Sequence, residues 1–245
     1  MQHNRKWVSP MSRKLSLFLS LTLVLALATA WLAAPSAARA GDWATQADYP
    51  LVGDDGQQLP NHTVRLLGAI DRLPGVVVVG NPHGAKTLTE FYDLNCPYCR
   101  QAARGIDDMI KHDRQLKLVL VPYPVLGVAS VAASRVELAV AKLGTPQQFY
   151  AFHLRMYAQR GRNDGLQALA VARRLGFNRH KLETLGDSAE ITRTMKNLVS
   201  LGDALGLVAT PSFIVGGVAI LGYPGPHALQ AIVDAVAACG RVICQ

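Results

Sequence analysis

The sequence is short of several residue types, and each shortage excludes a class of protein. Only 4 of its 245 residues are cysteine, too few for a scaffold held together by disulfides. Aromatic residues make up 7% and do not alternate with basic residues along a stripe, so no nucleic-acid partner is predicted. With 50% hydrophobic residues, the chain is long enough for one domain with a real core, or for one domain that carries an inserted subdomain.

Acidic residues are absent from the first forty positions. Without this segment the chain carries 20 basic and 17 acidic residues, so the formal net charge falls from +8 to +3. A basic start is followed by an uncharged apolar run at 15–34 and by Ala38-Arg39-Ala40, with small residues at the two positions that a signal peptidase reads. We therefore predict a signal peptide over 1–40 and a body outside the cytoplasm, with an uncleaved membrane anchor as the alternative.

The middle of the chain changes from strand-like to helical patterns. Residues 41–75 are rich in Gly, Asp, Pro and Gln, and we expect an extended N-terminal segment with one short strand or helical turn around 64–71. Runs at 76–79 and 86–93 read as strands, the residues after Cys96 repeat at helical spacing, and 116–121 reads as another strand. The order of strand, CxxC turn, helix and strand predicts a βαβ unit.

A long helical block then separates this unit from a second β segment. The block spans 127–207, and the β pattern resumes in SFIV and VAIL, which a tight turn at Gly216-Gly217 joins. A final amphipathic helix is expected over 226–239. These patterns predict an α/β domain interrupted by a helical insertion, in three parts: 76–126, the insertion at 127–207, and 208–245. Within the insertion, helices are expected at 129–143, 146–159, 165–175 and 188–205.

The cysteines fall into two close pairs, of which Cys96 and Cys99 lie at the start of a predicted helix. A thiol at this position faces unpaired amides and the positive end of the helix dipole, and both lower its pKa. Cys99 lies one turn further on and can resolve a mixed disulfide, while Pro97 suits the first helical turn. The spacing therefore favours thiol–disulfide exchange.

Other interpretations of this pair remain open. An envelope copper or zinc site would need two further ligands, and the second pair, far away and without a neighbouring histidine, is an awkward complement. A purely structural disulfide across so short a loop would constrain the unfolded chain little. The dithiol could also be incidental in a module that only binds.

Cys239 and Cys244 form the second pair, close to the C-terminus. Gly240 between them could end the last helix and let the chain turn back. In an oxidising compartment we expect a structural disulfide here, with an intermolecular bridge or an auxiliary redox pair as alternatives.

The CPYC motif after a strand, the helical insertion and Ala209-Thr210-Pro211-Ser212-Phe213 together resemble the DsbA family, which are thioredoxin-fold thiol–disulfide oxidoreductases of the bacterial envelope. The resemblance covers roughly 76–238. It implies an α/β thioredoxin fold with an inserted helical domain, a periplasmic enzyme without a cofactor, and Cys96 as the attacking and Cys99 as the resolving cysteine. It also implies unfolded or partly folded exported proteins as substrates, and a membrane redox partner that is DsbB-like or a reductase.

The resemblance also assigns roles to neighbours of the pair. Pro211 matches the family's cis-proline, which lies against the CxxC, and Thr210 before it would pair through its backbone with an extended substrate. Glu90 matches an acid found in some members. If it is buried behind the cysteines, its pKa rises and it can exchange protons with Cys99; the alternative is a solvent-facing strand residue. Pro97 and Tyr98 would tune the redox potential.

The direction of electron flow is less clear from the sequence. The family's strongest oxidant has His where this chain has Tyr98 and Val where it has Thr210, and both departures argue against strong-oxidase behaviour. A Thr before the cis-proline is more similar to the isomerase and reductase branches, which are usually oligomers through an N-terminal extension. The segment 41–75 is short and argues for a monomer. We favour disulfide formation, with an isomerase or reductase as the alternative.

Overall fold

The computed structural model describes residues 47–65 and 68–244. The predicted signal peptide over 1–40 therefore lies outside the described residues, and the N-terminal segment 41–75 is described only in part. Within the described ranges, no helix combines the length and the apolar character needed to span a membrane.

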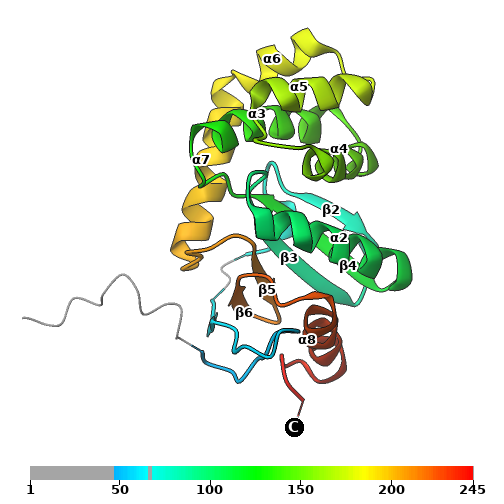
Figure 1. The fold of residues 1–245 in the computed structure, drawn as a ribbon, viewed down its shortest axis with the longest axis vertical. Helices are drawn as coiled ribbons and strands as arrows, with labels where there is room; N and C mark the ends of the chain where they lie inside the picture. The colour runs from blue at the N-terminus through cyan, green and yellow to red at the C-terminus, as the bar shows by residue number, and fades with distance from the viewer. Residues whose placement is uncertain (1–46, 66–67, 245) are drawn as a thin grey trace, which may run out of the picture. The chain divides into compact units, whose positions relative to one another are not determined.

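A six-stranded mixed sheet forms the centre of the α/β part, with its strands in the order β1-β6-β5-β3-β4-β2 (Figure 1). β3 (Lys86–Tyr92) and β4 (Leu116–Pro122) are parallel, and α2 (Pro97–His112) connects them, which confirms the predicted βαβ unit. All other neighbours are antiparallel. The remaining strands are β1 (Asn61–Thr63), β2 (Val77–Gly80), β5 (Ser212–Val215) and β6 (Val218–Leu221).

Helices cover both faces of the central strands, which explains why those strands read as continuous apolar runs. On one face, Leu118 and Leu120 of β4 belong to a core cluster with residues of α2 and of α8 (Pro226–Cys239). On the other face, Val119 and Val121 belong to a second cluster with residues of α7 (Ala189–Ala204). β3, which leads directly to Cys96, is thus held rigidly between two layers.

The segment between β4 and β5 is helical. Four of its five helices begin at a side chain that accepts a hydrogen bond from a backbone amide of the first turn, as N-caps do. These caps are Thr145, Asp164, Asn178 and Ser188. The helices are α3 (Val128–Leu143), α4 (Pro146–Ala158), α5 (Gly165–Arg174), α6 (Arg179–Gly186) and α7.

Of two local expectations from the sequence, one was met and one was wrong. A 3-10 turn at Ile70–Arg72 overlaps the end of 64–71, where a short strand or a helical turn was expected, and the strand β1 lies just before that range. Helix α6 was not among the expected helical stretches. It has only eight residues, of which Leu182 and Gly186 are buried, so its apolar periodicity is too short to be recognised.

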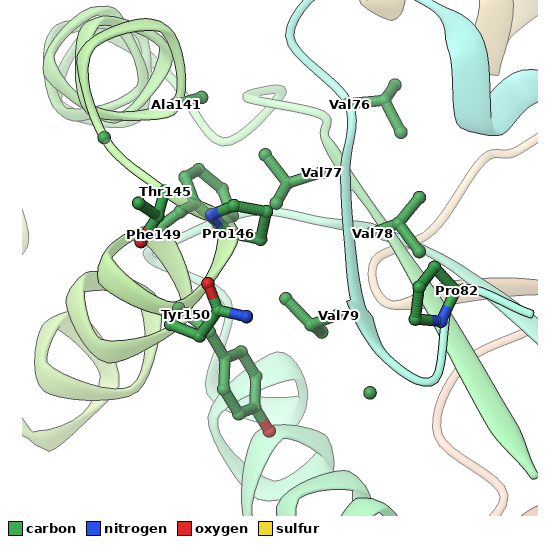
Figure 2. Close-up of a pocket in the computed structure, with 13 residues that line it drawn as sticks. Val76, Val77, Val78, Val79, Pro82, Ala141, Thr145, Pro146, Phe149 and Tyr150 are labelled. Atoms are coloured by element: carbon green, nitrogen blue, oxygen red, sulfur yellow. The ribbon is translucent and has the colours of Figure 1, made fainter.

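A hollow of about 510 Å³ lies between the edge strand β2 and the connection from α3 to α4. Figure 2 shows the residues that line it. The valines of the strand, Val77 and Val79 among them, line one side, and Pro146, Phe149 and Tyr150 line the other. None of its lining residues belongs to the CxxC pair or to the neighbours that the resemblance assigns. The hollow is therefore separate from those residues.

The four cysteines differ in state. Cys239 and Cys244 form a disulfide, and Gly240 between them has a φ of 73°, which ends α8 in a left-handed conformation. Cys96 and Cys99 are free thiols, so the structure represents the reduced form of this pair.

Candidate active site

Cys96 is the N-cap of α2, and Pro97 is the first residue of the helix. Its Sγ accepts a hydrogen bond from the amide of Cys99 at 3.4 Å and, as a thiol, donates to the carbonyl of Thr210 at 2.9 Å. The pKa of Cys96 is lowered to about 6, mainly by the hydrogen bond from the Cys99 side chain. Hydrogen bonds from the Thr210 side chain and from the amides of Cys99 and Tyr98 add to this effect, and burial opposes it.

Cys99 has the opposite character. It is fully buried, and burial raises its pKa well above the ordinary value, with the hydrogen bond to Cys96 and the charge of Glu90 acting in the same direction. At neutral pH the pair therefore consists of one thiolate, Cys96, and one protonated thiol, Cys99. Only the first is a nucleophile in this state.

Glu90 lies on β3, where it is only 1% exposed, so the interpretation as a solvent-facing strand residue was wrong. Neither of its carboxyl oxygens has a hydrogen-bond partner among the described residues. Burial raises the pKa of Glu90 to about 8, and the negative charge of Cys96 adds to the shift. A protonated carboxyl group thus lies in the interior at neutral pH, near enough to Cys96 and Cys99 to interact with them electrostatically.

The loop before β5 closes the site from the other side. The peptide bond between Thr210 and Pro211 is cis, and the Thr210 carbonyl accepts from Cys96. Tyr98 is 60% exposed, and Val208, two residues before Thr210, is also largely exposed. The structure therefore brings Glu90 and the CPYC motif together with the Thr210–Pro211 loop, whereas Cys96 itself is only 4% exposed.

A hydrogen-bond network that the sequence did not reveal fixes the loop before Cys96. The buried carboxylate of Asp93 accepts from Ser130 Oγ at 2.7 Å and from the amides of Asn95 and Leu126. Asn95 Nδ2 donates to the backbone carbonyl of Asn163, and Asn95 Oδ1 accepts from the backbone amide of the same residue. Ser130 comes 37 residues after Asp93, and Asn163 comes 68 residues after Asn95, so no local pattern predicted these partners.

The helical segment also holds the backbone of this loop directly. Asn163 Nδ2 donates to the Leu94 carbonyl at 2.7 Å, and the Tyr157 hydroxyl donates to the Asp93 carbonyl at 3.0 Å. The same Asp93 carbonyl accepts from the amide of Cys96. The helical segment therefore positions the first cysteine through the main chain that carries it.

The structure was also searched for metal-ligand groups. Across the described ranges, no three or more His, Cys, Asp or Glu side chains are grouped so that they could hold a metal ion. Cys96 and Cys99 therefore belong to no larger group of such side chains among the described residues.

The fold and the sequence were then compared with known proteins. A family model described as Thioredoxin matches residues 73–235, more than half of the chain. A thioredoxin-like oxidoreductase from Silicibacter pomeroyi DSS-3 is 30% identical and has a TM-score of 0.66, and the match covers 71% of this chain and 99% of that protein. Both matches extend across the β segments and the helical insertion.

More distant solved structures share the fold. The thiol-disulfide exchange protein alpha-DsbA2 from Wolbachia pipientis is 23% identical, with a TM-score of 0.60 and coverage of 65% of this chain and 86% of that one. BdbD from Bacillus subtilis is 20% identical, with a TM-score of 0.62 and coverage of 72% and 98%. At this level of identity the likeness concerns the fold alone.

One curated relative has a different description. A segment of 135 residues is 28% identical to the Na(+)/H(+) antiporter NhaA 1 of Salinispora arenicola (strain CNS-205). The match covers 54% of this chain but only 20% of the antiporter, so the chain spans about a fifth of that relative's length.

Proposed function

Since this chain belongs to the thioredoxin family, as a DsbA-like thiol–disulfide oxidoreductase, we propose that it forms disulfide bonds in exported proteins. The expected α/β thioredoxin fold with helices inserted in it is confirmed by the family match and the structural relatives. The observation that carries the proposal is the asymmetry of the dithiol. Cys96 is the N-cap of α2, where its Sγ accepts from the Cys99 amide and its pKa is lowered, whereas Cys99 is fully buried and its pKa is raised.

The reaction starts from the oxidised pair. A substrate thiolate attacks Sγ of Cys96 rather than that of Cys99, because Cys99 is fully buried. The bond between the two cysteines breaks, Cys99 takes the electron pair, and Glu90, protonated below a pH of about 8, supplies a proton to it. The product of this step is a mixed disulfide between Cys96 and the substrate.

The second step releases the oxidised substrate. A second substrate thiolate attacks the substrate sulfur of the mixed disulfide, and Cys96 leaves as a thiolate. The substrate has then lost two electrons to the enzyme, which holds one thiolate and one thiol. Because a thiol of lower pKa is a better leaving group, the lowered pKa of Cys96 favours this direction.

The thiolate stabilisation also bears on how strong an oxidant the disulfide is. The pKa of Cys96 is lowered to about 6, well below the ordinary thiol value of about 8.5. A stabilised thiolate favours the reduced form, which makes the disulfide more oxidising. This supports a disulfide donor, while the departures at Tyr98 and Thr210 argue against an oxidant as strong as the strongest of the family. An isomerase or reductase is the second candidate, and Thr210 favours it.

The cellular setting is part of the same proposal. The basic and apolar segment over 1–40 supports export to the periplasm. Substrates would be unfolded or partly folded exported proteins, and a membrane redox partner would reoxidise Cys96 and Cys99 after each turnover. The enzyme would act as a monomer and without a cofactor.

A redox equilibrium against a glutathione series tests the direction. The leaderless protein, with Cys239→Ser and Cys244→Ser, is equilibrated with each glutathione mixture and then alkylated. Mass spectrometry counts the alkylated, and therefore free, thiols. We expect a potential between about −120 and about −180 mV. A value well below roughly −180 mV would move the assignment to isomerase or reductase. A pair that never oxidises reversibly would overturn the redox function, and a Cys96→Ser/Cys99→Ser variant gives the baseline.

A further inference from the structure

The chain around the entrance to Cys96 carries arginines and no carboxylates. Four segments border the site, at 94–106, 123–129, 155–163 and 204–211, and none contains Asp or Glu. They contain five arginines in total: Arg100, Arg104, Arg155, Arg160 and Arg162. The formal charge that these four segments themselves carry is therefore wholly positive.

The carboxylates closest in sequence to these segments are buried or have partners of their own. Asp107 and Asp108, which directly follow the first segment, pair with Lys111. Glu90 and Asp93 are buried. Asp164 caps α5 by accepting from the amide of Gln167 at 2.9 Å, and Asp203 accepts from the Tyr123 hydroxyl at 2.6 Å. They therefore leave the arginines available to a molecule that approaches from solvent.

Arg162 lies directly beside the active-site loop. Together with Gly161 it lines a depression of about 540 Å³ whose other walls include Asn95, Leu126 and Val128. Asn95 immediately precedes Cys96, so the depression begins one residue from the nucleophile. We call it the Arg162 depression.

The arginines at this edge differ in the contacts that their side chains make. Arg100 donates to the carbonyls of Tyr157 and Gln159 and thereby fixes the loop that carries the other two. Arg160 and Arg162 are exposed. The arginine ion pairs found among the described residues involve Arg135 and Arg179, not these two.

The walls of the depression also offer apolar contact. Leu126 is 52% and Val128 is 87% exposed, which is unusual for side chains of this kind. An extended polypeptide with its cysteine at Cys96 could lay an apolar side chain on these two residues. A carboxylate near its cysteine would then lie within reach of Arg162.

We propose that the Arg162 depression selects substrate segments in which carboxylates flank the cysteine, and that Arg160 and Arg162 determine this specificity. The inference rests on the proposed function, since it concerns the substrates of the same thiolate. Complementary charge speeds encounter and disfavours like-charged partners. Segments with lysines beside their cysteine are therefore poor substrates.

Two reduced peptides test the proposal, one with Asp and one with Lys on both sides of a single cysteine. The rate at which each peptide reduces the Cys96–Cys99 disulfide is measured by quenching the reaction at set times and determining the mass of the alkylated protein. Rates are expressed per peptide thiolate, because flanking charges change the pKa of the peptide thiol. At low ionic strength we expect the acidic peptide to react about tenfold faster, with the preference shrinking as salt is added.

Charge-reversal variants locate the effect. In Arg160→Glu/Arg162→Glu we expect the preference for the acidic peptide to disappear or reverse. Arg173→Glu/Arg174→Glu changes the net charge equally at the far end of α5, and there the preference should persist. A preference for the acidic peptide that is equal in all three proteins, or that is absent from the wild type, would contradict the proposal that the Arg162 depression selects substrates.

A neutral thiol, 2-mercaptoethanol, distinguishes a failure of this inference from a failure of the proposed function on which it rests. If it reduces the Cys96–Cys99 disulfide in the wild type while the two peptides react alike, exchange stands and the specificity is wrong. If no thiol reacts at this disulfide, the proposed function fails and the specificity falls with it.

Discussion

Replacing Cys96 with alanine should reduce disulfide exchange to the uncatalysed background, whereas Cys99→Ala should trap the mixed disulfide. Cys96 is the sulfur whose pKa is lowered to about 6, and its Sγ faces the Thr210 carbonyl at the entrance. Cys99 is fully buried and protonated, so it cannot take over the attack. Without Cys99, a partner attached to Cys96 cannot be displaced from within the protein.

The measurement is the mass of each variant after incubation with oxidised glutathione. Cys99→Ala should carry one glutathione per chain, Cys96→Ala none, and the wild type only the internal disulfide. Retaining Cys239 and Cys244 in all three proteins is an internal control, because their disulfide should be unchanged. An adduct of equal yield on Cys96→Ala would contradict the assignment of the two roles.

Changing Glu90 to glutamine should stabilise the protein against unfolding by about 3 kcal/mol at pH 7. The unfolded carboxyl group loses its proton near 4.5, while burial keeps the folded group protonated up to about 8. Between these pH values the unfolded state is favoured by ionisation, so the stability of the wild type falls as pH rises. Below about 4.5 the effect vanishes, and above about 8 it is at its maximum.

Urea unfolding at several pH values measures this effect. The slope with pH should disappear in Glu90→Gln. Glu137→Gln is the matched control, because Glu137 is also a buried carboxyl group but accepts a hydrogen bond from Tyr92 at 2.8 Å. Neutralising it should bring no gain. Equal stability of Glu90→Gln and the wild type at pH 8 would show that Glu90 is not the buried, unpartnered acid described here.

Glu90→Gln should also slow the steps in which Cys99 gains or loses a proton. We expect resolution of a mixed disulfide with glutathione to be at least about tenfold slower at pH 7, while the attack by Cys96 changes less. Stopped-flow measurement of the two phases separates these effects. A gain in stability without any loss of rate would make Glu90 a structural residue only.

Much of the fold was readable from the sequence because its elements are strongly patterned. The apolar runs of β3 and β4 and the amphipathic face of α2 gave the βαβ unit, and Gly216-Gly217 marked the hairpin. Helix α6 was missed because a short helix on the surface has little periodicity to detect.

The candidate site was only partly predictable. Cys96, Cys99 and Glu90 lie within ten residues of one another, so local spacing and the resemblance identified them. The contacts of Asp93 and Asn95 with Ser130 and Asn163 depend on how the helical segment packs against the loop. Nothing near Asp93 and Asn95 in the chain indicates their distant partners.

The most direct test of the account is the pH dependence of alkylation of the reduced protein at Cys96. Iodoacetamide reacts with thiolate alone, so the rate reports the ionised fraction. Our account predicts a midpoint at about pH 6 for Cys96, with Cys99 unmodified throughout the neutral range. A midpoint near the ordinary thiol value of about 8.5, or alkylation of both cysteines at similar rates, would contradict it.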